Sequence, residues 1–308
     1  MAKDTDLQDA ILRTLCYADV FDYPLTLSEV RHWLIGPLGS QSGNRSALRK
    51  AIREAYPKIK ATNGYYHLKE RSQIVALRNK RGREAVAKKA IAAKVASWLK
   101  IIPSVRMVAT TGALAMENTD ESDDIDLMLI ARNKRLWLTR LFVLALVSLI
   151  AKRRQPTKLG TNTKKQWKNA ICLNLFLDED ALAIPRPKRN LYTAHEVVQV
   201  KPIVAKDDIM ERFLGENTWV KHYLPHSLEE TEKKERKKGK SENMPKRSST
   251  PEAIGNLLER LAYRLQKRIM ETKRTNETIQ PRRAFFHPRN TAAIILGSYQ
   301  KRLRRFRL

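Results

Sequence analysis

Asp124 and Asp126 are the residues of this sequence best suited to chemistry. They begin a run, residues 124–130, that is otherwise apolar and predicts a strand. Side chains alternate between the two faces of a strand, so both carboxylates are expected on the same face. Like charges side by side repel each other, and a bound divalent cation offsets that repulsion. Oxygen ligands of this kind suit Mg²⁺.

The surroundings of these carboxylates are basic. From Leu127 to Leu177 there is no Asp or Glu, whereas Lys and Arg occur eleven times. Upstream, Gly112-Ala113 forms a small-residue turn, and a glycine lets a phosphate approach the backbone because it has no Cβ. The pattern therefore predicts a site for a metal ion and phosphates. A solvated acidic loop is the alternative, but it explains Asp126, among apolar neighbours, poorly.

The flanking segments predict an α/β domain around a small mixed sheet. Strands are expected at residues 105–110, 124–131 and 170–177, with an apolar helix at 136–151. That helix is interrupted by an arginine and is shorter than the roughly 20 residues that span a membrane, so we expect it to be buried. Two further helices are expected, at residues 190–202 and 208–223.

Residues 105–177 resemble the core of the polymerase-β-type nucleotidyltransferase superfamily, in which a glycine turn precedes an acidic strand. The resemblance covers about seventy residues. It implies that Asp124 and Asp126 hold catalytic Mg²⁺, in a two-metal site, and that Gly112 and Ala113 border a nucleoside triphosphate. Asn174, on the next strand, stands where the family commonly has a third acid.

Two departures from the family pattern bear on catalysis. Ala113 replaces the usual serine after the glycine and removes a hydroxyl. Asn174 carries no charge and cannot accept a proton, so its presence is expected to weaken the metal site and slow proton removal.

Other residues were weighed as replacements for the missing acid. Three acidic residues follow the strand, and a histidine and a glutamate lie further on; these are Asp178, Glu179, Asp180, His195 and Glu196. Thr193 and Glu196 fit a capping box, which would explain Glu196 without chemistry. His287, beside two phenylalanines, is expected to pack rather than react.

Residues 1–72 predict a winged-helix-like domain of three helices and a hairpin. Thr26 and Glu29 fit a capping box, and Asn63-Gly64 is a strong hairpin signal. The third helix presents basic residues to a nucleic-acid groove, with Asn63-Gly64 as the wing tip; these are Arg45, Arg49, Lys50 and Arg53. A packing or dimerisation unit is the alternative.

The remaining boundaries follow from composition. A basic helix over residues 73–100 is expected to connect the first domain to a nucleotidyltransferase-like domain over 101–226. Residues 227–250 hold eight Lys/Arg, five Glu and almost nothing apolar, which predicts a disordered charged linker. Residues 251–308 are expected to form a basic helical segment, beginning with an amphipathic helix marked by Ile254, Leu257, Leu258, Leu261 and Leu265.

Charge and cysteine usage limit the partners and the compartment. The 308-residue chain has 60 Lys+Arg against 32 Asp+Glu, a formal net charge of +28. This excess favours DNA or RNA, nucleotides or an anionic membrane surface as partners. Cys16 and Cys172 lie in apolar stretches without metal-ligand spacing, which indicates buried thiols in a reducing cytoplasm.

Three functions fit the sequence. The first is a Mg²⁺-dependent nucleotidyltransferase that moves a nucleoside monophosphate from an NTP to a hydroxyl of a nucleic acid, a protein or a small molecule. The second is a non-catalytic nucleic-acid-binding or regulatory protein with a degenerate core, which Asn174 favours. The third is the protein-modifying subset of small nucleotidyltransferases. Nothing in the sequence selects the acceptor.

Overall fold

The computed structural model describes residues 2–36, 44–154, 167–229, 231, 252–271, 278–286 and 290–308. The N-terminal part contains three helices and a hairpin: α1 (Ala2–Asp19), α2 (Leu27–His32), α3 (Arg45–Glu54), β1 (Ile59–Thr62) and β2 (Tyr65–Leu68). The predicted hairpin is confirmed, and both Asn63 and Gly64 have positive φ, as a two-residue hairpin turn requires. The capping box of Thr26 and Glu29 at the start of α2 is confirmed as well.

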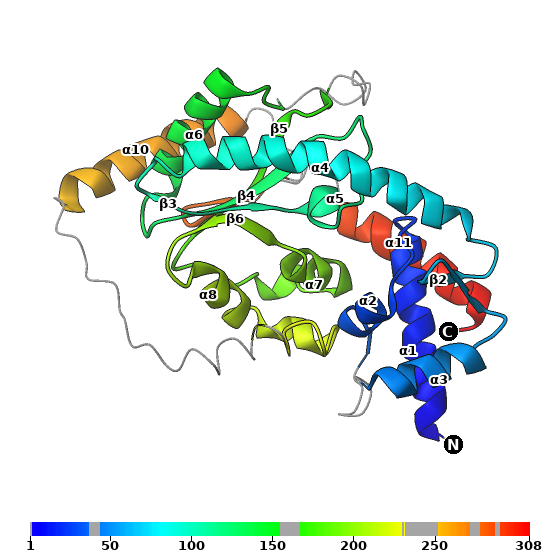
Figure 1. Cartoon of the computed structure of the whole chain (residues 1–308). Coiled ribbons are helices and arrows are strands. Elements are labelled where there is room, and N and C mark those ends of the chain that lie inside the picture. The colour runs from blue at the N-terminus through cyan, green and yellow to red at the C-terminus, as the bar shows by residue number, and fades with distance from the viewer. Residues whose placement is uncertain are drawn as a thin grey trace.

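A long helix, α4 (Gln73–Leu99), runs from the N-terminal helices to the sheet, as predicted (Figure 1). The central sheet has six strands in the order β6-β3-β4-β5-β8-β7. Their bounds are Val105–Thr110 for β3, Ile125–Ala131 for β4, Ile171–Asp178 for β5, Lys201–Ala205 for β6, Thr278–Gln280 for β7 and Arg283–Phe285 for β8. Only the β4–β5 pairing among these is parallel, so the sheet is mixed.

Both faces of the sheet are covered, and β4 shows how (Figure 1). Ile125, Leu127 and Leu129 pack in the cluster that includes α4 and α6 (Leu136–Ile150), while Met128 and Ile130 pack in the cluster that includes α7 (Leu191–Val198) and α8 (Ile209–Gly215). Strands covered on both sides are apolar almost throughout, which is the pattern that the sequence has here. The period of two places Asp126 on the α7 side, with Met128 and Ile130.

The C-terminal part of the chain joins both ends of the molecule. α10 (Glu252–Glu271) packs on α6, the short strands β7 and β8 extend the sheet beyond β5, and α11 (Thr291–Phe306) packs on α1 (Figure 1). The two strands were not predicted in this segment, because three residues each is too short for an alternating pattern to be read.

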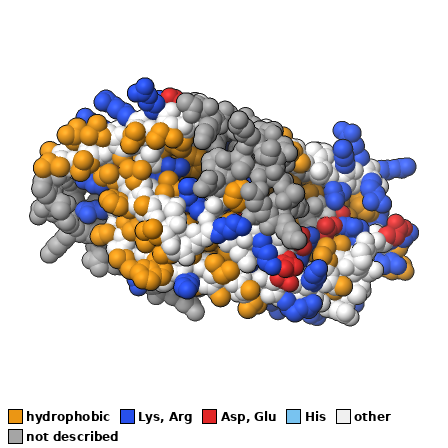
Figure 2. Space-filling model, turned by 90° about the horizontal axis from the view of Figure 1, so that it is seen from above, with side chains coloured by type: hydrophobic (Ala, Val, Ile, Leu, Met, Phe, Trp, Pro, Cys, Tyr) orange, Lys and Arg blue, Asp and Glu red, His pale blue; other side chains and the backbone are white. Residues whose placement is uncertain are grey.

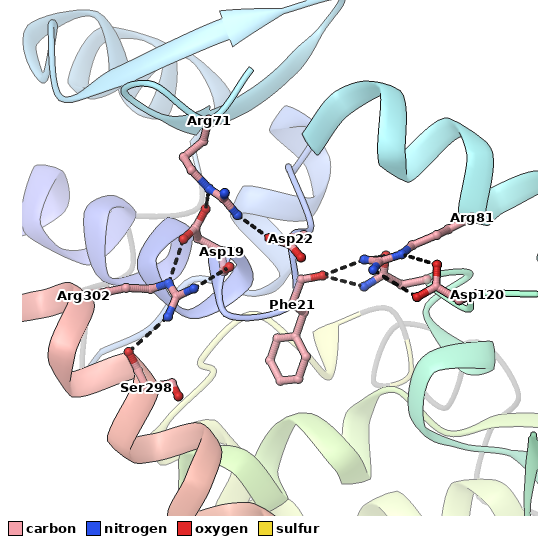
Figure 3. Close-up of polar contacts among 9 residues, drawn as sticks. Asp19, Phe21, Asp22, Arg71, Arg81, Asp120, Ser298 and Arg302 are labelled. Carbon is pink, nitrogen blue, oxygen red and sulfur yellow. Dashed lines mark hydrogen bonds and ion pairs between the residues drawn. The ribbon is translucent and has the colours of Figure 1, made fainter. Parts of the chain in front are cut away.

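Asp19 ties the N-terminal helices to α11 and to the loop before α4. Its carboxylate accepts from Arg71 Nε at 2.6 Å and from Arg302 Nε at 2.7 Å (Figure 3). Arg81 of α4 meanwhile donates to the carbonyl of Phe21 and to the carboxylate of Asp120. Charged hydrogen bonds between three regions fix the N-terminal helices against the core.

The structure differs from several of the predictions. The helix expected over 190–202 is divided into α7 and the strand β6, and the helix expected over 208–223 into α8 and the 3₁₀ helix Thr218–His222. The apolar helix α6 is buried along one side only, and Phe142 and Leu149 are exposed. Nearly all of the predicted linker, residues 230 and 232–250, and His287 lie outside the described residues. No helix of the described part is both long and apolar enough to cross a membrane.

Candidate metal centre

The turn after β3 brings backbone against the acidic strand. Gly112 has a φ of +58°, in the left-handed region that favours glycine. A Cβ added there would lie 3.0 Å from Oδ2 of Asp126. Glycine is thus required at this position for two reasons, and the group that approaches it in the structure is the Asp126 carboxylate. Contact of Gly112 and Ala113 with a phosphate stays a prediction.

The two predicted carboxylates do come together. Asp124 lies immediately before β4, which begins at Ile125, and Asp126 is its second residue. Ligand atoms of Asp124, Asp126 and Cys172 all lie within 4.8 Å of one another, which is a spacing that could hold a metal ion. The two aspartates thus lie close together, although Asp124 lies just before the predicted strand and not on it.

Cys172 was not expected at this site. It pairs with Asp126 across the parallel β4–β5 register, so the two side chains are neighbours. Burial raises the pKa of the Cys172 thiol far above its usual range, and the charges of Asp126 and Asp124 raise it further. The thiol therefore stays protonated and hydrogen-bonds to Asp126. The two hard carboxylates suit Mg²⁺, whereas a soft cation that used the thiol would have to displace its proton.

Asp124 and Asp126 lie close together, and the positive charge around them does not fully balance their negative charge. Burial, followed by the charge of Asp124, raises the pKa of Asp126 to about 7. Arg154 forms an ion pair with Asp124 and partly balances the pair. A divalent cation would supply the positive charge that Asp126 lacks, so the donor set fits such an ion.

Asn174 reaches the site from β5 and is aimed there by a bulge. Leu127 pairs with Leu173 and Met128 with Leu175, which leaves Asn174 as the extra residue. Its Nδ2 donates to Asp126 Oδ1 at 3.0 Å, whereas its Oδ1 is buried without a hydrogen-bond partner in the described structure. A buried acceptor with no partner is costly, and turning the amide would bring this oxygen to the Asp126 side, where a bound cation would satisfy it.

Glu196 faces the same region from α7. The predicted capping box of Thr193 and Glu196 is wrong, because Asn190 is the N-cap and Thr193 supplies the reciprocal contact. Glu196 thus lies about one helical turn after Thr193, the residue that makes the reciprocal capping contact. Burial, followed by the charge of Asp126, raises the pKa of Glu196 to about 7. The capping box therefore does not explain Glu196, and its carboxylate is available to the site.

The other proposed replacements are not part of the site. Asp178 lies at the far end of β5, paired with Ala131, and its carboxylate accepts from the backbone of Lys134 and Asp180. Glu179 accepts from Arg106 and from the backbone of Asn133 at the same far end. These acids hold loops together and lie several residues of strand away from Asp126.

His195 is packed between two aromatic rings. Its imidazole stacks on Tyr17, with centroids 3.9 Å apart, and on Trp33 at 5.3 Å. Nδ1 lies 2.9 Å from the carbonyl of Leu191, and burial lowers the pKa of His195 to about 4. A neutral histidine held on two sides in this way joins α7 to the N-terminal helices.

Lys88 of α4 supports the loop that carries the acids, and no sequence pattern singled it out. Its side chain is 2% exposed, and Nζ donates to three oxygens: Glu121 O at 3.1 Å, Asp123 O at 2.6 Å and Asn169 Oδ1 at 2.9 Å. Three acceptors match the three donors of an ammonium group. The helix thereby fixes the residues just before Asp124.

Two pockets adjoin the turn and share Tyr192, Glu196 and Thr291. One, of about 410 Å³, lies between Gly112-Ala113 and aromatic side chains of the N-terminal helices, among them Tyr17 and Trp33. The other, of about 380 Å³, is lined by Thr111, Asn174, Lys188 and Phe285 among others. Pockets of this size accommodate small molecules, and Glu196 faces both.

Comparison of the chain with models of protein families, with curated proteins and with solved structures gives no match in any of the three. The function is therefore argued from the site alone.

Proposed function

We propose that this chain is a Mg²⁺-dependent nucleotidyltransferase that moves a nucleoside monophosphate from an NTP to a hydroxyl acceptor. The observation that carries the proposal is the convergence of Asp124 and Asp126 beside the Gly112 turn, with the side chain of Asn174 hydrogen-bonded to Asp126. Asp124 and Asp126 would hold the metal, and Asn174 would add a neutral oxygen ligand once its amide turns, because Nδ2 now faces Asp126. Bound Mg²⁺ would neutralise phosphate charge and stabilise the developing oxyanions.

The reaction needs a group that takes the proton of the attacking hydroxyl. The hydroxyl oxygen bonds to the α-phosphorus, the bond from that phosphorus to the α–β bridging oxygen breaks, and pyrophosphate leaves. We assign the proton to Glu196, the carboxylate that lines both pockets beside Gly112-Ala113 and Asn174. Asn174 cannot take this role, because an amide does not accept a proton at neutral pH.

The test is incubation of the protein with each labelled NTP and Mg²⁺, scoring pyrophosphate and labelled products over a panel of nucleic-acid, protein and small-molecule hydroxyls. Asp126→Asn is expected to abolish turnover and Glu196→Gln to lower it by about 10²–10⁴-fold. Asp180→Asn is the matched control, since this exposed acid lies at the far end of β5 and should leave turnover unchanged. Equal rates in Glu196→Gln and wild type would refute the assignment of the base.

A second candidate function is nucleic-acid binding without turnover, and the surface of α3 favours it. Arg49 and Arg53 are exposed on one side of α3, and the hairpin turn Asn63-Gly64 is exposed nearby in sequence. The protein would then be inert with every NTP and bind duplex DNA or RNA with a steep salt dependence. Arg49→Ala with Arg53→Ala would weaken that binding and flatten the salt slope.

A further inference from the structure

The helix α10 turns its apolar side outward. Six of its large apolar side chains are between 48% and 63% exposed: Ile254, Leu257, Leu258, Leu261, Leu265 and Ile269. Their spacing of three and four residues places them along one side of the helix. We refer to these six residues as the α10 stripe. A continuous apolar surface of this kind on a folded protein marks an interaction site.

The orientation of α10 is fixed by polar contacts on its buried side. Glu259 is 8% exposed and accepts from the backbone N–H groups of Trp137 and Leu138, at 2.7 and 2.9 Å, at the start of α6. Gln266 donates to the carbonyl of Trp137 at 2.8 Å. If the stripe faced inward, the backbone groups of Trp137 and Leu138 would lose Glu259 and Gln266 as partners. Leucine side chains would then be buried against the start of α6. The contacts of Glu259 and Gln266 therefore keep the α10 stripe on the surface of the folded protein.

The adjoining helix α6 extends this surface. Leu141, Phe142 and Leu149 are 36%, 59% and 83% exposed, although the helix packs against α10 and the sheet. Figure 2 shows hydrophobic side chains gathered over the end of the molecule where these helices lie, with Lys and Arg among and around them. The apolar surface therefore spans two packed helices.

Basic residues run beside the stripe. Arg260, Arg264 and Arg268 are exposed and follow the same helical spacing, so they form a row parallel to it. Glu271 is the acid of this row, and it pairs with Lys267 at 3.6 Å. α6 contains no acid. An apolar stripe flanked by arginines is the composition of helices that lie in the plane of a membrane interface.

We propose that the face formed by α6 and α10 docks on the surface of an anionic lipid bilayer. The arginine row would meet the lipid headgroups and the stripe would enter the acyl boundary. A second copy of the chain fits less well, since it would cover the stripe but leave the arginine row without an anionic partner. Nucleic acid would use the arginines but leave the leucines exposed to water. The proposal is independent of the chemistry at Asp126.

The test is flotation of the full chain with phosphatidylglycerol vesicles and with neutral phosphatidylcholine vesicles. The wild type is expected to float with the anionic vesicles and not with the neutral ones. The triple variant Leu257→Gln, Leu261→Gln, Leu265→Gln should lose at least about tenfold in partitioning. Arg260→Glu with Arg264→Glu should lower it too, and should make it less sensitive to salt. These side chains are exposed, and circular dichroism verifies that each variant is folded.

Val86→Gln and Tyr56→Gln form the matched control, because these side chains are 68% and 69% exposed, on α4 and in the turn after α3. Partitioning of this control should equal that of the wild type. Three results would overturn the proposal: no flotation of the wild type with anionic vesicles, equal flotation of the triple variant, or equal loss in the control. A wild-type dimer in sedimentation that the triple variant converts to a monomer would assign the face to a second copy instead.

Discussion

Replacing Lys88 by methionine removes an ammonium group while keeping the packing of its stem. Glu121 O and Asn169 Oδ1 would lose their donor, whereas Asp123 O keeps the backbone N–H of Asn169 at 3.2 Å. Two stranded acceptors cost about 1–3 kcal/mol each. Burial of the charged ammonium group is itself unfavourable, as the lowered pKa of Lys88 indicates. Removing that charge offsets part of the cost. We expect a net loss of about 2–4 kcal/mol in the free energy of unfolding.

The loss is measured by urea denaturation followed by circular dichroism, and it corresponds to a fall in Tm of roughly 3–6 °C. Because the lost contacts hold the loop before Asp124, Mg²⁺ or Mn²⁺ affinity should also fall by about tenfold, the scale found for groups that orient metal ligands. Lys89→Met is the matched control: this neighbour pairs with exposed Glu117, so its removal should change stability by less than about 0.5 kcal/mol. A Lys88→Met protein as stable as wild type would refute the bracing role.

Three further predictions concern the site and its surroundings. Gly112→Ala should cost about 1–2 kcal/mol in stability and weaken metal binding, because its Cβ would press on Asp126; Gly64→Ala, at φ +80° with no atom within 4 Å, should cost stability alone. The contribution of His195 to stability should fall by about 3 kcal/mol between pH 6.5 and pH 4, because the unfolded chain binds a proton at His195 that the folded chain excludes; Asp126 and Glu196 contribute with the opposite sign, so the change is read as the difference between the unfolding free energies of wild type and His195→Phe in urea, and the same pH dependence in both would contradict it. Cys172→Ser should leave Mg²⁺ affinity unchanged by calorimetry, since a protonated thiol is no ligand for this ion; a large loss would make Cys172 a ligand.

The sequence predicts the strands of the core well because they are continuous apolar runs. β3, β4 and β5 agree with their predicted bounds to within one residue, and so does the hairpin around Asn63-Gly64. Local signals suffice where a strand is buried on both faces or a turn requires positive φ. Asp124 and Asp126 lie close together, as their spacing of two predicts, although Asp124 lies one residue before β4.

Long-range contacts account for what could not be predicted. Cys172 joins the carboxylates through the β4–β5 register, and a bulge directs Asn174, so neither follows from spacing within one segment. Glu196 comes from a helix that the chain reaches only after β5, and Asn190 caps that helix in place of Thr193. Apolar periodicity in α10 predicted the helix but not which side is buried, because Glu259 and the backbone of α6 decide that.

The central claim, that Asp124 and Asp126 hold a divalent cation, is tested most directly by titrating the metal-free protein with Mn²⁺, read by electron paramagnetic resonance, with Mg²⁺ as competitor. We predict saturable binding that Mg²⁺ displaces, that Asp126→Asn lowers by at least about a hundredfold, and that Asp180→Asn leaves unchanged. Equal Mn²⁺ affinity in wild type and Asp126→Asn would contradict the account.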